Sequence, residues 1–229
     1  MNIAETVQSV ISPPHKAGYP FIIGGVVVLA IGLLFWHPLA WLGLIFVLFC
    51  LYFFRDPDRV APPRENVFVA PADGLVVSIE RAIPPPELGL APEPRMRVAI
   101  FLSVLDVHVN RAPIAGTVQK VAYHPGLFLS AAEDKASDDN ERNALLLRTH
   151  DGQDVVVVQI AGLIARRILC DVTEGQALTT GQRFGIIRFG SRTDLYLPEG
   201  CTPLVAVGQR MIGGETVIAE LSPVATSFP

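Results

Sequence analysis

The hydrophobic positions divide the chain into an apolar N-terminal part and a longer part with short, interrupted runs. Two uncharged runs, 19–36 and 39–54, stand on either side of His37-Pro38. Because proline continues a helix poorly, they predict two helices joined by a tight turn. Each helix would measure roughly 24–27 Å, slightly less than the ~30 Å hydrocarbon core of a bilayer. The pattern therefore favours a membrane-anchoring helical hairpin over 1–54, either spanning or re-entrant.

Charge is confined to the flanks of this hairpin. Lys16 precedes the first apolar run, Arg55 and Arg59 follow the second, and the turn between the runs carries no charge. The positive-inside tendency then places both flanks, and the domain that follows, on the cytoplasmic face of the cell (inner) membrane. A cleaved signal peptide is disfavoured because a second apolar run follows at once. Core helices of a soluble protein are disfavoured by the length of the uncharged stretch.

After the hairpin, a proline-punctuated linker (55–66) leads into short β-type runs separated by glycine and proline. The linker arginines either attract anionic lipid or are ordinary flanking charge. The spacing and β-branched content of the runs predict a mainly β, antiparallel domain over 67–229. A helical turn is expected over 162–167 and a polar loop over 130–143. The expected strands are 75–83, 97–102, 117–123, 144–148, 155–160, 195–197, 204–207 and 216–221.

Composition narrows the functional classes. Half of the residues are hydrophobic and 17% are charged, which excludes intrinsic disorder. The net charge is 18 − 22 = −4, so an electrostatic nucleic-acid binder is also excluded. The three cysteines have no CxxC spacing and no histidine close in sequence, which disfavours a disulfide scaffold and a zinc site.

One histidine stands out from the other four. His108 follows an apolar strand in 101–113, with Asp106 two residues before it and Asn110 and Arg111 after it. On a strand, a spacing of two places Asp106 and His108 on one face. The segment therefore concentrates an acid, an imidazole, an amide and a guanidinium where a site could open. A structural histidine at a strand edge is the alternative.

Two further motifs carry possible chemistry. Asp73 lies in PADG (71–74), where Asp-Gly is typical of a turn. The pair Gly190-Ser191 interrupts a strand-like sequence over 184–198. It indicates either a bulge or hairpin, or a strained peptide bond whose serine attacks the preceding carbonyl.

Taken in order, these features resemble the short form of the phosphatidylserine decarboxylase proenzymes. The resemblance covers nearly the whole chain. Its motifs are FFRDP (53–57), PADG (71–74), FLSVLDVHVNRAP (101–113), HPG (124–126), NERN (140–143), FGSRTD (189–194) and GGETV (213–217).

The resemblance implies self-cleavage between Gly190 and Ser191 into a β chain, 1–190, and an α chain, 191–229, which stay associated. Ser191 would become an N-terminal pyruvoyl group, the cofactor. This group would form a Schiff base with phosphatidylserine and accept the electrons left by decarboxylation, as pyridoxal phosphate does elsewhere. The products would be phosphatidylethanolamine and carbon dioxide. No pyridoxal lysine is obvious among the three lysines. Assembly into a homo-oligomer is left open.

The resemblance also assigns roles to side chains. Asp73 matches the aspartate that assists self-cleavage in longer relatives, and His108 matches the first of their two histidines, with Arg111 standing where the second would be. His108 is therefore expected to be the base and Asp73 to orient it, with His124 as the next candidate. Substrate phosphate or carboxylate would be held by Arg111, Arg142 or Arg188.

Because every candidate catalytic residue lies after Arg55, removing 1–54 is expected to impair membrane association and leave a processed domain.

Two other functional classes compete with this interpretation. Glycine-containing segments resemble the flattened β-barrels of lipoyl and biotinyl carriers, with Lys135 as the modified lysine. Such a carrier would leave the hairpin, PADG and Gly190-Ser191 unexplained, so the overlap indicates a barrel-like, flattened β-sandwich fold. The other class is a membrane-anchored binding module without catalysis.

Overall fold

The computed structural model describes residues 12–126, 140–162, 167–188 and 191–221. The chain forms two compact units. The first comprises Met1–Asp58 and Leu105–Val109, and the second comprises Arg59–Val104 and Asn110–Pro229. A short segment containing His108 thus belongs with the N-terminal helices and not with the strands that flank it in sequence.

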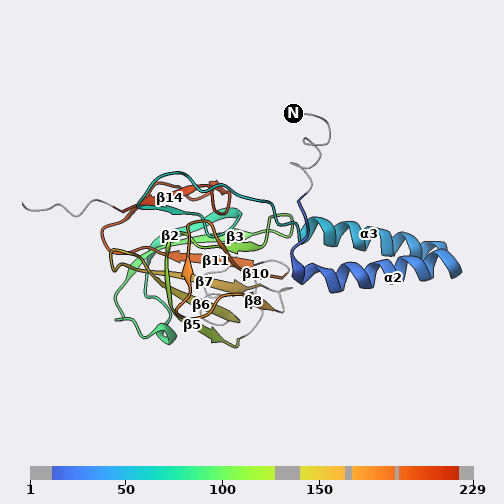
Figure 1. Ribbon diagram of the computed structural model, residues 1–229, viewed down its shortest axis with the longest axis horizontal. Helices are drawn as coiled ribbons and strands as arrows, with labels where there is room; N and C mark the ends of the chain where they lie inside the picture. Colours follow the sequence, from blue (N-terminus) through green and yellow to red (C-terminus); the bar gives the residue numbers. More distant parts are fainter. Residues whose placement is uncertain (1–11, 127–139, 163–166, 189–190, 222–229) are drawn as a thin grey trace, which may run out of the picture. The chain divides into compact units, whose positions relative to one another are not determined.

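The first unit is an antiparallel helical hairpin (Figure 1). A 3-10 turn, η1 (Lys16–Gly18), leads into α2 (Tyr19–Phe35), and α3 (His37–Phe53) follows. The predicted hairpin is confirmed. The break between the helices falls at Trp36, whose backbone is extended. Pro38 then lies in the first turn of α3, where the backbone N–H that proline lacks would have no partner within the helix.

Small residues let the two helices approach closely. A Cβ on Gly32 would lie 2.1 Å from the Ala40 nitrogen, and one on Gly43 would lie 2.5 Å from the Leu29 nitrogen. Glycine at such positions is typical of helix pairs packed within lipid. By length and composition, the helix over Lys16–Phe35 could cross a membrane, whereas His37–Phe53 is shorter.

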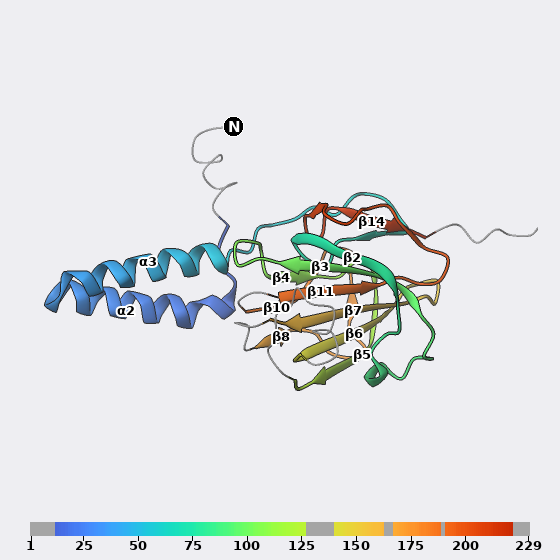
Figure 2. The same ribbon diagram turned by 180° about the vertical axis from the view of Figure 1, so that it is seen from behind.

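The second unit is mainly β, as predicted, and its largest sheet curls into a half-barrel (Figures 1 and 2). The eight-stranded sheet has the order β13-β2-β3-β11-β7-β6-β5-β9, and two three-stranded sheets have the orders β1-β14-β12 and β4-β10-β8. A short 3-10 turn, η2 (Pro86–Leu88), follows β2 in the chain. The strands are β1 (Val67–Val69), β2 (Gly74–Ala82), β3 (Arg95–Leu102), β4 (Val109–Arg111), β5 (Gly116–His124), β6 (Arg142–Arg148), β7 (Asp154–Ala161), β8 (Ile168–Cys170), β9 (Ala177–Leu178), β10 (Arg183–Ile187), β11 (Ser191–Tyr196), β12 (Thr202–Pro203), β13 (Arg210–Met211) and β14 (Val217–Glu220).

Most expected strands appear within two or three residues of their predicted bounds. The expected strand over 204–207 is wrong: this segment is a loop, and its apolar side chains Leu204 and Val207 are exposed. The helical turn expected over 162–167 and the polar loop over 130–143 lie largely outside the described residues. Within the described part of that loop, β6 begins at Arg142.

Alternation along the central strands separates two faces of the large sheet. Leu195 on β11, Val157 on β7 and Leu145 on β6 belong to the main core. Residues two positions away on the same strands point to the same side. Ser191 and Thr193 therefore share the core-facing side with Leu195, whereas Tyr196 belongs to a separate apolar cluster on the other side.

Two glycines with positive φ allow a test of the packing at the start of β2. Gly74 has φ +150°, and a Cβ there would lie 2.2 Å from the Phe101 carbonyl oxygen. Gly152 has φ +78° and no atom within 4 Å of such a Cβ. Gly152→Ala should destabilise the protein by about 1 kcal/mol through φ alone. Gly74→Ala should cost about 3 kcal/mol or more, since strain and clash add.

The measurement is urea unfolding of each full-length variant in detergent micelles. Equal losses of stability for the two variants would contradict the close approach of β2 and β3 at Gly74.

Candidate active site

The candidate residues of the second unit gather at one end of the large sheet. Ser191 is the first residue of β11 and pairs with Leu102 of β3 on one side and Ala161 of β7 on the other. On the far side of β3, Leu75 pairs with Phe101, so the start of β2 lies beside Leu102. Asp73 immediately precedes this start. With strands about 4.8 Å apart, Asp73 lies two strands, about 10 Å, from Ser191.

The Ser191 hydroxyl is buried and makes no hydrogen bond to any residue that the structure describes. An unpartnered buried hydroxyl costs about 1–3 kcal/mol, so its retention requires a reason other than stability. Gly190, the other half of the predicted scissile pair, lies outside the described residues.

A chain of buried amides runs beneath the same face. Asn143 donates to the Gln159 side-chain oxygen (3.0 Å), and Gln159 donates to the Asn110 side-chain oxygen (2.7 Å). Asn110 in turn donates weakly to the Thr193 hydroxyl (3.5 Å). Satisfied polar networks in a low-dielectric interior fix side-chain orientation, so this amide chain holds β6, β7, β4 and β11 in register next to Ser191.

Sequence reasoning missed Gln159 as a functional candidate. Its signal was a single amide within the apolar strand Asp154–Ala161. A buried amide in such a strand needs a partner, and the partner proves to be Asn110, which follows the histidine motif.

Asp73 is held by an arginine and a backbone amide. Arg59 donates to one carboxylate oxygen (2.9 Å), and the Gly213 N–H donates to the other (2.8 Å). The backbone N–H of Arg111 donates to the backbone carbonyl of Pro71 (2.8 Å). Motifs far apart in sequence, PADG, the end of FLSVLDVHVNRAP and GGETV, therefore meet around one carboxylate.

Arg111 lies against this cluster. Its side chain is buried and donates to the Gly181 carbonyl (3.0 Å). A Cβ on Gly214 would lie 2.9 Å from the Arg111 Cδ, which shows how tightly the GGETV turn covers it.

His108 belongs to the first unit and is fully buried. Residues 104–106 form a turn and not a strand, so Asp106 meets His108 through its backbone carbonyl, 2.9 Å from Nδ1. Because a carbonyl only accepts, Nδ1 carries the proton and Nε2 is the unprotonated nitrogen. Burial lowers the pKa of His108 to about 4, and Asp106 only partly opposes this effect. The imidazole is neutral at physiological pH, as a proton acceptor must be.

The other basic candidates are distributed over different faces. Arg142 pairs directly with Ile160, which belongs to the cluster on the side of the sheet away from Ser191, and it forms an ion pair with Glu87. His124 shares this position: its Nδ1 lies 3.1 Å from the Glu87 carboxylate. Both residues therefore lie on the opposite side of the sheet from the Ser191 side chain.

Arg188 lies just after β10, three residues before Ser191 in the chain. The backbone N–H of Arg188 donates to the backbone carbonyl of Arg167 (3.3 Å). Burial, with the charge of Arg167 in second place, lowers the pKa of Arg188. Its position in the chain keeps it close to the predicted scissile bond.

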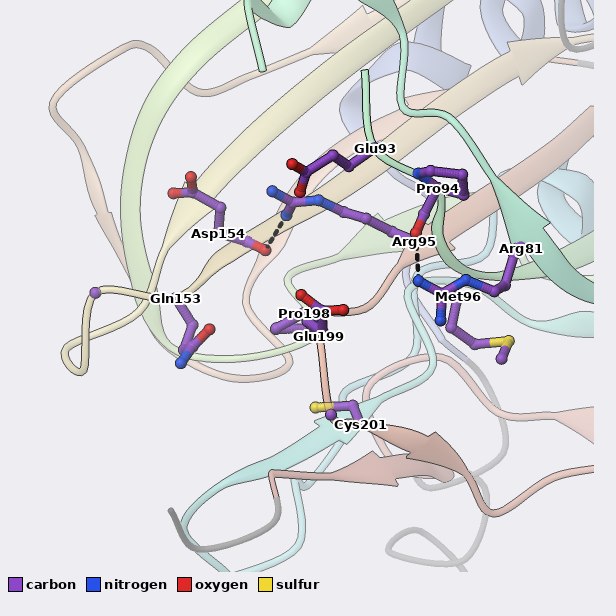
Figure 3. Close-up of a pocket in the computed structure, with 12 residues that line it drawn as sticks. Arg81, Glu93, Pro94, Arg95, Met96, Gln153, Asp154, Pro198, Glu199 and Cys201 are labelled. Atoms are coloured by element: carbon purple, nitrogen blue, oxygen red, sulfur yellow. Dashed lines mark hydrogen bonds between the residues drawn. The ribbon is translucent and has the colours of Figure 1, made fainter. Parts of the chain in front are cut away.

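A pocket of about 450 Å³ opens at the opposite end of the sheet (Figure 3). Arg95, which lines it, donates to the Asp154 carbonyl (2.8 Å). Pro198, which lines the pocket, lies two residues beyond the last residue of β11, whereas Ser191 is the first residue of that strand. At about 3.3 Å per residue, this separation is roughly 20 Å, so the chemistry of Ser191 is not assigned to this pocket.

Comparison of the sequence with known proteins identifies the family of this chain. Residues 46–219 match the family model for phosphatidylserine decarboxylase. The phosphatidylserine decarboxylase proenzyme of Granulibacter bethesdensis is 64% identical over 223 residues, covering 97% of this chain and 91% of the relative. The chain belongs to the phosphatidylserine decarboxylase family.

Further relatives carry the same name. The phosphatidylserine decarboxylase proenzyme of Cereibacter sphaeroides is 58% identical over 95% of this chain and 94% of its own length. That of Gluconacetobacter diazotrophicus is 58% identical over 96% of this chain and its whole length. Family membership confirms the resemblance drawn from the motifs and leaves no support for a lipoyl-type carrier. Lys135, on which that alternative rested, lies outside the described residues.

The burial of a neutral His108 predicts an acid-sensitive step in stability. Its pKa is about 4 in the folded chain and near 6.5 when unfolded, so the unfolded chain binds more protons between these values. Stability should therefore fall as the pH drops from about 6.5 to about 4, by about 3 kcal/mol in total.

The His108→Gln variant should lack this part of the acid dependence. The measurement is urea unfolding of both proteins in detergent between about pH 4 and pH 8. Parallel pH profiles for the two proteins would show that His108 is not buried in its neutral form.

Proposed function

We propose that this chain is a proenzyme that cuts itself at Gly190-Ser191 and then decarboxylates phosphatidylserine to phosphatidylethanolamine and carbon dioxide. The observation that carries the proposal is the buried Ser191 hydroxyl at the head of the central strand β11, which has no hydrogen-bond partner among the residues that the structure describes. Membership of the phosphatidylserine decarboxylase family and the proenzyme names of its relatives support the same conclusion.

The proposed self-cleavage uses only the chain and water. The Ser191 oxygen attacks the Gly190 carbonyl carbon, and the peptide nitrogen leaves to give an ester. Loss of the Ser191 Cα proton then expels the Gly190 carboxylate and leaves dehydroalanine at the new N-terminus. This elimination separates the chain into 1–190 and 191–229. Water then replaces the nitrogen of the dehydroalanine, which leaves as ammonia, and the pyruvoyl group results.

We assign the proton transfers of this reaction to His108, with Asp73 as its partner. The tautomer held by the Asp106 carbonyl leaves Nε2 as the accepting nitrogen. His108 is two residues before Asn110, whose amide contacts Thr193, so covalent geometry alone keeps the His108 and Asn110 Cα atoms within about 7 Å. Asp73 is fixed by Arg59 and the Gly213 amide, and a fixed carboxylate can stabilise a developing positive charge.

After cleavage, the pyruvoyl keto group supplies the electron sink that decarboxylation of an amino acid requires. The chain's own residues would hold the substrate beside it. Arg111 and Arg188 are the proposed partners of the substrate phosphate or carboxylate, since guanidinium groups bind both. Arg142, on the other face and paired with Glu87, is not carried forward in this role.

Membrane attachment through the hairpin is part of the proposal. The substrate's acyl chains stay in the bilayer, and an apolar helix over Lys16–Phe35 is long enough to hold the enzyme there. The flanking charges Lys16, Arg55 and Arg59 favour the cytoplasmic face of the membrane for the second unit.

Self-cleavage is tested by intact mass measurement of the purified protein. Wild type should give two fragments that separate between 190 and 191, the smaller one carrying a pyruvoyl group. Ser191→Ala should remain a single chain, because it has no attacking oxygen. Ser78→Ala removes a hydroxyl from β2 and should be processed like wild type. An intact wild-type chain with full decarboxylase activity would overturn the proposal.

The roles of His108 and Asp73 are tested by a time course of cleavage after synthesis. His108→Ala and Asp73→Ala should each slow cleavage by roughly 10²–10⁴-fold, the usual contribution of general acid–base groups. Because they act as a unit, the double variant should be little slower than the slower single one. The controls are His150→Ala and Asp151→Ala, which alter an exposed histidine and an exposed aspartate. Cleavage of His108→Ala at the wild-type rate would remove His108 from the mechanism.

A further inference from the structure

The last turn of α3 and the residues just after it are bonded to the segment that carries His108. The Tyr52 hydroxyl donates to the Leu105 carbonyl (3.1 Å), and the Arg55 guanidinium donates to the same oxygen (2.7 Å). Arg55 also donates to the Tyr52 carbonyl (2.8 Å), and its guanidinium carbon lies 4.0 Å from the centre of the Tyr52 ring. One carbonyl, three residues before His108, is thus clamped from two directions.

The imidazole itself is covered by the helix. The Phe53 ring centre lies 4.3 Å from that of His108, at an interplanar angle of 33°. Phe53 is fully buried, and its ring centre lies 5.9 Å from that of Phe49 and 5.0 Å from that of Phe54. These neighbouring rings fix its position. A fixed aromatic face sets the plane of the imidazole and keeps water from it.

We infer that Tyr52, Phe53 and Arg55 are positioning residues for His108, which makes the end of the hydrophobic hairpin a part of the catalytic machinery as well as an anchor. The inference rests on the proposed role of His108 as the base of self-cleavage, and on its proposed second role after cleavage, in which it, or a water it holds, returns a proton to the substrate Cα during decarboxylation. Phe53 orients the ring, and the Tyr52–Arg55 clamp fixes the turn before it. Together with the Asp106 carbonyl at Nδ1, these contacts determine where Nε2 points.

The inference changes the expected result of removing the hairpin. From the sequence, deletion of 1–54 would leave a processed domain, because all candidate catalytic residues lie after Arg55. In the structure, that deletion removes Tyr52 and Phe53 and exposes His108 to water. The truncated chain should therefore lose catalytic rate even with a short-chain, water-soluble phosphatidylserine that needs no membrane.

The experiment uses the full-length protein in phosphatidylcholine vesicles containing phosphatidylserine. The variants are Tyr52→Phe, Arg55→Ala, Phe53→Ala and Phe53→Tyr, with Phe46→Ala as the matched control on the same helix. Cleavage rate is read by gel, and kcat and KM are measured per processed chain. Tyr52→Phe deletes one oxygen from a half-exposed side chain, so it keeps the test decisive if Phe53→Ala fails to fold.

We expect kcat to fall about 5-fold in Tyr52→Phe and about 10-fold or more in Arg55→Ala and Phe53→Ala, with KM unchanged. Phe53→Tyr, which keeps the ring, should restore most of the rate. The pH profile gives a readout that a merely structural role would not move. Between about pH 5 and pH 7, kcat should be flat in wild type, whereas in Phe53→Ala it should decline with falling pH, because a hydrated His108 titrates near 6.5. The charged groups that act on His108, Asp106 and Arg55, are retained in that variant.

Failure of the inference is separable from failure of the proposed function. If His108→Ala abolishes cleavage and the Phe53 and Tyr52 variants behave like Phe46→Ala, the helix does not position the base and only the inference fails. If His108→Ala is fully active, the assignment of the base fails first. Loss of rate in Phe46→Ala equal to that in Phe53→Ala would reduce the effect to hairpin stability and overturn the inference.

Discussion

The structure depends on β11 being hydrogen-bonded on both sides from its first residue. Ser191 pairs with Leu102 and Ala161, and both ladders continue to Tyr196. Every strand that these ladders join to β11 comes from before residue 191. A break at 190–191 would therefore remove one covalent bond and leave the ladders intact. β13 and β14 add pairings with β2 and β1, so the segment after the break would be held at three places. This explains how two chains could stay together without a disulfide.

On the core-facing side, the central strands β11 and β7 carry polar side chains at one end and apolar side chains at the other. On the core-facing side, β11 runs from Ser191 and Thr193 to Leu195, and β7 runs from Gln159 to Val157. The polar end is closed by the amide chain from Asn143 to Thr193, and the apolar end is packed into the main core. A reaction centre at Ser191 would therefore lie beside fixed amide dipoles, at a buried position. Electrostatic stabilisation is most effective in such surroundings, because the dipoles need not reorganise during the reaction.

Sequence patterns predicted the helices and strands of this fold better than they predicted which elements pair and which side chains meet. The uncharged runs identified both helices, and β-branched runs separated by glycine and proline located most strands of the large sheet, because these signals are local. The segment 204–207 was mistaken for a strand because its residues are apolar. In the structure Leu204 and Val207 are exposed, and the Leu204 backbone N–H bonds to the Ile218 carbonyl of β14 without a continued strand pairing. The motifs identified the family and the candidate residues. They did not reveal that Arg142 faces away from Ser191, nor that Gln159 supports Asn110, because both facts arise from pairing between distant strands.

The contact between Phe53 and His108 also joins segments that are far apart in sequence, and no local pattern predicted it. It suggests at which depth of the membrane the chemistry would take place. Tyr52 and Arg55 are residues typical of the boundary between lipid and water, and both bind the Leu105 carbonyl. In a membrane-attached chain, this would place the turn that carries His108 at the depth of the lipid headgroups. The carboxylate of a phosphatidylserine lies in that layer, while its acyl chains remain below. His108, tied to the interfacial end of α3, would therefore meet the serine headgroup, whose Cα must be protonated after decarboxylation, without extraction of the lipid. A base carried only by the β unit would depend on how that unit is oriented at the membrane.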